Sequence, residues 1–148
     1  MASYEVSATR RIAAPASRVY AVISDYRDGH PHILPPSAFR KIDVERGGIG
    51  EGTVFRVELR VLGATSEMRM AVTEPVPGRV LAETDLASNA VTTFTVDEDA
   101  GGESCTVTIA TTLNGRGGPV GALERFTTAR LLRRLYDQEL DMLEKHVS

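Results

Sequence analysis

The 29 residues 119–147, close to the end of the sequence, carry the only long helical pattern of the chain, and it follows about 75 residues that are typical of short strands. Apolar residues recur in it at the spacing of one buried helix face: Val120, Leu123, Phe126, Leu131, Leu132, Leu135, Tyr136, Leu140, Leu143 and Val147. A long amphipathic helix needs an apolar surface to lie on, and the preceding strands can supply one. A curved sheet wrapped round such a helix is a shape that can enclose a pocket.

The chain length and charge narrow the class of protein. A chain of 148 residues predicts a single domain, 1–148, with an ordinary core. The net charge of −3 and the lack of a basic block argue against a nucleic-acid binder. The one cysteine, Cys105, excludes an intramolecular disulfide and is expected to be a small buried residue in a strand. No signal peptide and no membrane-spanning run is visible, so we expect a cytoplasmic protein.

The first 36 residues predict a strand, a short helix and a proline-rich segment. Residues 4–12 alternate apolar and polar side chains, which predicts a half-buried strand. Pro15 then opens a short helix that is expected to end near 28–29. The segment 30–36 holds three prolines, so it is either a loop or a broken second helix. It is apolar for a loop, and we expect it to cover another part of the molecule.

Six further strand patterns follow, at 39–46, 53–62, 65–74, 79–85, 90–97 and 104–113. Short turns join them, which indicates an antiparallel meander and not a parallel sheet with crossover helices. The glycine-rich segment 114–118 precedes the long helix and is expected to be a flexible hinge. The predicted order is therefore strand, helix, a second broken helix or loop, six strands and a long helix.

Four stretches carry sequence motifs: Ile12-Ala-Ala-Pro15 with Val19-Tyr20 and Asp25-Tyr26, Gly50-Glu-Gly-Thr53, Glu74-Pro-Val-Pro-Gly-Arg-Val80, and Thr93-Phe-Thr95 through Cys105-Thr-Val-Thr108. Over roughly residues 4–146 they resemble the superfamily of START, Bet v 1 and polyketide cyclase proteins (SRPBCC). The resemblance implies an α+β helix-grip fold, in which a seven-stranded curved antiparallel sheet wraps round the C-terminal helix and leaves a cavity. It does not fix the activity, because this superfamily includes lipid carriers, receptors, cyclases and chaperone regulators.

Candidate residues for the cavity wall are those in the strand and helix phase that faces inward: Phe55, Val57, Leu59, Met68, Met70, Val107, Ile109 and Leu132. Each of them is also compatible with a plain core position. Candidates for polar groups that orient a ligand are Arg10, Tyr20, Tyr26, His32 and Tyr136. Arg10 lies in the apolar phase of its strand, so it either meets a ligand carboxylate or phenolate, or reaches solvent from a sheet edge.

Two histidines occupy the Pro-bounded segment, where many members of the superfamily carry a tryptophan. His30 and His32 suit either acid–base chemistry at a pocket mouth or a packing role in a lid. A metal site needs more ligands than His146 alone can add, and there is no cysteine pair. We therefore expect neither a metal nor a cofactor.

Three hypotheses for the function follow. The first is binding of a hydrophobic small molecule, such as a lipid, an isoprenoid or a polyketide-like compound, between sheet and helix. The alternative is an enzyme of the polyketide cyclase or dehydratase type, which needs two or three polar groups converging deep in the cavity. A second alternative is an interaction module like the chaperone regulators, which predicts a filled core. Both a monomer and a homodimer are compatible with the sequence.

Overall fold

The computed structural model describes residues 2–148. Its elements in chain order are β1 (Ala2–Ile12), α1 (Ala16–Ser24), the 3-10 helix η1 (His30–Ile33), β2 (Phe39–Arg46), β3 (Val54–Val61), β4 (Ala64–Val76), β5 (Val80–Asp85), β6 (Val91–Glu98), β7 (Cys105–Gly115) and α2 (Gly118–Val147). The predicted order is confirmed, and every predicted strand matches to within two residues at each end.

The first helix is shorter than predicted. It ends at Ser24 because Asp25 adopts an extended backbone, and the Asp25 carboxylate accepts hydrogen bonds from the backbone N–H groups of Arg27 and Asp28. Local bonds of this kind compete with continued helix formation. The segment after it contains the 3-10 helix η1, which agrees with the broken second helix that its prolines allowed.

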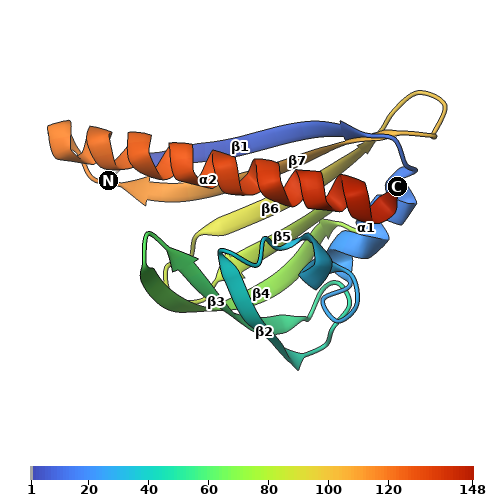
Figure 1. Cartoon of the computed structure of the whole chain (residues 1–148), viewed down its shortest axis with the longest axis horizontal. Coiled ribbons are helices and arrows are strands. Elements are labelled where there is room, and N and C mark those ends of the chain that lie inside the picture. The colour runs from blue at the N-terminus through green and yellow to red at the C-terminus, as the bar shows by residue number, and fades with distance from the viewer. Residues whose placement is uncertain (1) are drawn as a thin grey trace.

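All seven strands form one antiparallel sheet in the order β1-β7-β6-β5-β4-β3-β2, so β1 and β2 are its edges. Only the β1–β7 pair joins strands that are not consecutive in sequence, with a register that runs from Ala2 opposite Gly115 to Ile12 opposite Cys105. The sheet is curved, and α2 runs along β1 and β7 on its inner side, with α1 near the C-terminal end of α2 (Figure 1). This is the expected helix-grip architecture.

The C-terminal half of α2 lies on the core, but its N-terminal part does not. Leu135, Leu140 and Leu143 are buried, whereas Val120 and Leu123 are about two-thirds exposed, at 65% and 66%. Phe126 is similarly exposed. The prediction of one continuous buried stripe is therefore wrong for the first turns of α2. The reason is that these turns extend beyond the ends of β1 and β7 and have no sheet beneath them (Figure 1).

A single hydrophobic cluster joins the inner face of the sheet to α1 and to the second half of α2. Its largest fully buried side chains include Tyr26, Phe94, Ile12 and Leu140. Cys105 is buried in the same cluster and has a free thiol, as the sequence predicts. Within residues 2–148, no helix has both the length and the hydropathy needed to cross a membrane.

Candidate functional site

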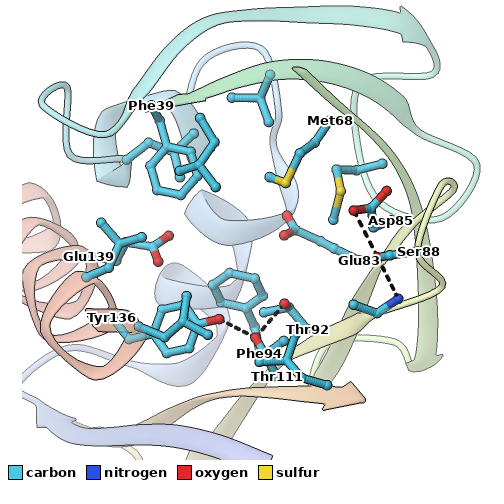
Figure 2. Close-up of a pocket in the computed structure, with 18 of the residues that line it drawn as sticks. Phe39, Met68, Glu83, Asp85, Ser88, Thr92, Phe94, Thr111, Tyr136 and Glu139 are labelled. Carbon is cyan, nitrogen blue, oxygen red and sulfur yellow. Dashed lines mark hydrogen bonds between the residues drawn. The ribbon is translucent and has the colours of Figure 1, made fainter. Parts of the chain in front are cut away.

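A cavity of about 280 Å³ lies between the inner face of the sheet, η1 and α2 (Figure 2). Its wall is mostly apolar and comes from strands β2 to β7, from η1 and from α2. The lining residues are His30, Leu34, Phe39, Phe55, Val57, Leu59, Met68, Met70, Glu83, Asp85, Ser88, Ala90, Thr92, Phe94, Thr111, Leu113, Thr128, Leu132, Leu135, Tyr136 and Glu139. The volume is near the lower end of the range of small-molecule pockets.

Most of the predicted wall residues line this cavity: Phe55, Val57, Leu59, Met68, Met70 and Leu132. Tyr136, predicted as a polar group that orients a ligand, lines it too. Val107 and Ile109 do not. They share a face of β7 with Thr111 and Leu113, but they lie further toward its start, where both are buried in the hydrophobic cluster. The cavity therefore occupies only one end of the space between sheet and helix.

Glu83 projects into the cavity from β5 and is almost completely buried. The Tyr26 hydroxyl donates a hydrogen bond of 2.6 Å to its Oε2 atom. Burial, the charge of Glu83 and this hydrogen bond together raise the pKa of Tyr26 well above its usual value of 10.0. Tyr26 is thus a fixed hydrogen-bond donor, and it orients one side of the Glu83 carboxylate.

His30 is the second neighbour of Glu83. Its Nδ1 atom lies 2.7 Å from the backbone carbonyl oxygen of Ile23. A carbonyl oxygen can only accept, so Nδ1 carries a proton, and Nε2 is left to face Glu83 at 3.5 Å. The ring stacks on Tyr26 with centroids 4.4 Å apart and meets Phe94 edge-on. The position of His30 is therefore fixed from three sides.

Three hydroxyl groups form a hydrogen-bonded chain along the cavity wall. Thr92 on β6 and Thr111 on β7 share a hydrogen bond of 2.6 Å, and Thr111 also bonds to the hydroxyl of Tyr136 on α2 (Figure 2). Burial raises the pKa of Tyr136 to about 12, although the bond to Thr111 opposes this shift. These hydroxyl groups give the cavity a neutral polar patch beside its apolar wall.

Glu139 is the fourth polar feature, and it projects from α2 toward Glu83 (Figure 2). Only 3% of its surface is exposed. Burial, and secondarily the charge of Glu83, raise the pKa of Glu139 well above the ordinary 4.5. Among residues 2–148 no group donates a hydrogen bond to this carboxyl. Its oxygen atoms nevertheless remain accessible, because no fully buried side-chain oxygen in this part of the chain lacks a partner.

Sequence reasoning missed Glu83 and Glu139 as site residues, although a signal was present. Glu83 shares the strand phase of the fully buried Leu81, and Glu139 falls within the apolar stripe that includes Tyr136 and Leu143. A charged residue in an apolar phase is the same signal that drew attention to Arg10. His30 was weighed only as a group at the pocket mouth or in a lid, whereas it is 1% exposed and lies deep in the site.

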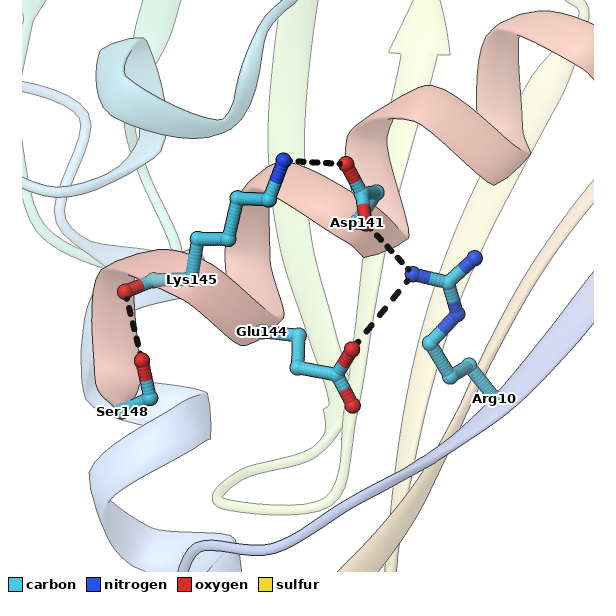
Figure 3. A network of polar contacts seen from close by, with 5 residues as sticks. All are labelled: Arg10, Asp141, Glu144, Lys145 and Ser148. Atoms are coloured by element: carbon cyan, nitrogen blue, oxygen red, sulfur yellow. Dashed lines mark hydrogen bonds and ion pairs between the residues drawn. The ribbon is translucent and has the colours of Figure 1, made fainter.

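Arg10 lies outside the cavity. β1 is an edge strand, and the Arg10 guanidinium reaches across to α2, 3.4 Å from the Asp141 carboxylate and 3.8 Å from Glu144 (Figure 3). Lys145 also pairs with Asp141, so these side chains form a small network on the surface. Of the two interpretations of Arg10, the structure thus supports a position at the sheet edge.

Tyr20 and His32 also lie away from the cavity. The Tyr20 hydroxyl donates a hydrogen bond of 2.6 Å to Glu74 on β4. His32 is exposed and stacks on His146 with ring centroids 4.9 Å apart. Both residues join secondary-structure elements, and neither is among the cavity-lining residues.

The charges of the cavity are all of one sign. Its lining includes the carboxyl groups of Glu83, Asp85 and Glu139, and of the residues that the structure describes no Lys or Arg lines it. In that same part of the chain no group of three or more His, Cys, Asp or Glu side chains is arranged to hold a metal ion. The carboxyl groups of the cavity can accept or supply protons. Without a Lys or Arg in the described lining, the cavity disfavours ligands that carry a negative charge.

Comparisons with known proteins agree with this geometry. The model of the family described as "Polyketide cyclase / dehydrase and lipid transport" matches residues 3–148. The solution structure of the KanY protein is 34% identical, with 99% of each chain covered and a TM-score of 0.84. None of the curated proteins matches the chain in sequence.

Two further solved structures share the fold at lower sequence identity. The Zhui aromatase/cyclase from Streptomyces sp. R1128 is 18% identical, with 99% of this chain and 94% of that chain covered and a TM-score of 0.78. A START superfamily protein from Mycobacterium smegmatis is 16% identical, with 97% and 96% covered and a TM-score of 0.72. At these identities the similarity shows the fold alone.

Proposed function

Because the chain belongs to the polyketide cyclase / dehydrase and lipid transport family, we propose that it binds a mostly apolar small molecule in the cavity between its sheet and α2. The observation that carries this proposal is the cavity itself, about 280 Å³ in volume and walled by Phe55, Met68, Met70, Leu132 and their neighbours. Removing apolar ligand surface from water drives such binding. The volume suits a molecule of one or two fused rings or a short isoprenoid.

The flexible side chains of the wall support the same proposal. Met68 and Met70 project from β4 into the cavity, and a thioether side chain adapts its shape to an irregular ligand. A filled core, which an interaction module of the chaperone-regulator kind predicts, does not fit the presence of this cavity. The exposed residues Val120 and Leu123 lie on α2 outside the cavity and have no role in the proposed binding.

A fluorescence titration with ethylnaphthalene tests the proposal. Leu132→Trp places a larger side chain in the cavity, whereas Leu123→Trp makes the same change at an exposed position on the same helix. We expect Leu132→Trp to weaken binding roughly tenfold or more, because the added ring occupies the ligand's volume. Leu123→Trp should bind as the unchanged protein does. Equal binding by all three proteins would contradict the proposal, as would no binding to the unchanged protein.

A second candidate function is catalysis of the cyclase or dehydratase type, and the group of His30, Glu83 and Tyr26 favours it. His30 and Glu83 both line the cavity, the Nε2 atom of His30 lies 3.5 Å from the Glu83 carboxylate, and Tyr26 and the Ile23 carbonyl hold the two side chains in place. A fixed imidazole beside a carboxylate can remove a proton from a carbon atom next to a ketone. Such a proton transfer begins an aldol ring closure or a dehydration.

Exchange of the methyl protons of acetonaphthone in D₂O, followed by NMR, tests this candidate. A working base should accelerate the exchange roughly a hundredfold over the buffer rate. His30→Asn should abolish the acceleration, because asparagine can keep a donor for the Ile23 carbonyl but provides no base. His32→Asn is the matched control, since His32 is exposed and outside the cavity. Exchange at the buffer rate with the unchanged protein would rule out this catalysis.

A further inference from the structure

The Glu139 carboxyl combines burial with a missing partner. It is 3% exposed, lines the cavity, and receives no hydrogen bond from any other described residue, while its oxygen atoms remain accessible. Buried polar groups in folded proteins are almost always paired, either with protein groups or with another ordered molecule. A group of this kind that also points into a cavity indicates that its partner is the bound molecule.

The protonation of Glu139 follows from the groups around it. Glu83 from β5, Tyr26 from the segment that follows α1 and Tyr136 from its own helix interact with it electrostatically, and His30 and Asp85 also line the cavity. Glu83 accepts a hydrogen bond from the Tyr26 hydroxyl. Glu139 has no such donor, and two buried carboxyl groups that interact do not both ionise. The proton therefore remains on Glu139.

We propose that Glu139 donates a hydrogen bond to a carbonyl oxygen of the bound molecule, so that the cavity selects ketones and aldehydes over carboxylates. The inference rests on the proposed binding function and names the chemical class of its ligand. A neutral carboxyl group is a strong donor in an apolar site, and a carbonyl oxygen is an acceptor without charge. A carboxylate ligand would meet Glu83, Glu139 and Asp85 with no Lys or Arg among the cavity-lining residues described.

Four naphthyl probes of similar size separate the alternatives: ethylnaphthalene, acetonaphthone, naphthoate and naphthylethylamine. We expect acetonaphthone to bind roughly three- to tenfold more tightly than ethylnaphthalene, which corresponds to one net hydrogen bond. Naphthoate should bind more weakly than both. Tighter binding of naphthylethylamine than of acetonaphthone would overturn the proposal, because it would mean that Glu139 acts as a carboxylate that pairs with a cation.

Two substitutions of Glu139 sharpen the test. Glu139→Gln keeps a neutral N–H donor of nearly the same shape, so it should keep the preference for acetonaphthone. Glu139→Leu removes the donor and should remove the preference while ethylnaphthalene still binds. Loss of the preference in Glu139→Gln would overturn the proposal. Failure of ethylnaphthalene to bind the unchanged protein would instead contradict the proposed function, so the two failures are distinguishable.

The carbonyl stretching frequency and the pH dependence give readouts that a purely structural role would not change. In the unchanged protein and in Glu139→Gln, infrared spectra should show the acetonaphthone carbonyl shifted to lower frequency, and Glu139→Leu should show no such shift. The affinity of the unchanged protein for acetonaphthone should fall as pH rises through the raised pKa of Glu139. Glu139→Gln should show no such fall, and an equal fall in both proteins would overturn the proposal.

Discussion

The Tyr26 hydroxyl donates a hydrogen bond of 2.6 Å to the Glu83 carboxylate across 57 residues of sequence, and both side chains are buried. This bond joins the segment after α1 to β5 at the inner end of the cavity. It also gives the carboxylate a fixed orientation in a wall that is otherwise mostly apolar. The following predictions test this bond and the structure around it.

Tyr26→Phe should destabilise the protein by about 1–3 kcal/mol, because it leaves the buried Glu83 carboxylate without its hydroxyl donor. Urea denaturation measures the change. Tyr20→Phe is the control, since its hydroxyl makes a bond of the same length to Glu74 that is only partly buried. We expect a loss below about 1 kcal/mol for the control. Equal losses in the two variants would mean that burial of the acceptor has no effect here.

Glu139→Gln should stabilise the protein at neutral and higher pH. Because the folded pKa of Glu139 is raised, this group contributes stability below its ordinary pKa of 4.5, and that contribution is lost as pH rises toward the folded pKa. Glutamine does not titrate. Thermal unfolding should therefore show the melting temperatures diverging above pH 4.5 in favour of the variant. Glu5→Gln, at an exposed position, should show no such divergence.

Leu140→Ala should destabilise the protein by about 2–5 kcal/mol, because Leu140 is fully buried where α2 lies on the core. Leu123→Ala, on the exposed first part of the same helix, should change stability by less than about 0.5 kcal/mol. Chemical denaturation measures both values. A large loss in Leu123→Ala would indicate that the first turns of α2 lie against another surface.

Arg10→Gln should leave binding of ethylnaphthalene unchanged, because Arg10 pairs with Asp141 and Glu144 on the outside of α2 (Figure 3). Its effect on stability should stay below about 1 kcal/mol, as is usual for partly exposed ion pairs. A fluorescence titration and urea denaturation check the two values. Weakened binding would instead place Arg10 in contact with the ligand.

Local pattern was enough to predict the elements. The alternation in β3 placed Phe55 and Val57 on the inner face, and both are buried. The pattern failed at the start of α2, where Leu123 has the correct helical phase but is 66% exposed. The first turns of this helix extend beyond the sheet (Figure 1). Phase says which side of a helix is apolar, but it contains no information on where the opposing surface ends.

The predicted polar groups also show that local sequence does not decide which side chains reach the cavity. Tyr136 lines the cavity and Tyr26 bonds to the cavity residue Glu83. Tyr20 on α1 and His32 on η1, close to Tyr26 in sequence, make their contacts elsewhere. The sequence offered no means to separate them. A difference of a few residues along α1 and η1 changes the direction of a side chain, and only the packing of these segments against the sheet fixes that direction.

The sequence by itself determined the order of the elements, the family, and the inward-facing apolar residues, since these depend on periodicity and local turn chemistry. Only the tertiary structure decided that Glu83 and Glu139 face one cavity, with His30 and Tyr26 beside the first and no donor beside the second. The physical reason is that the curvature of the sheet and the placement of α2 bring these distant positions together, and burial then changes their protonation.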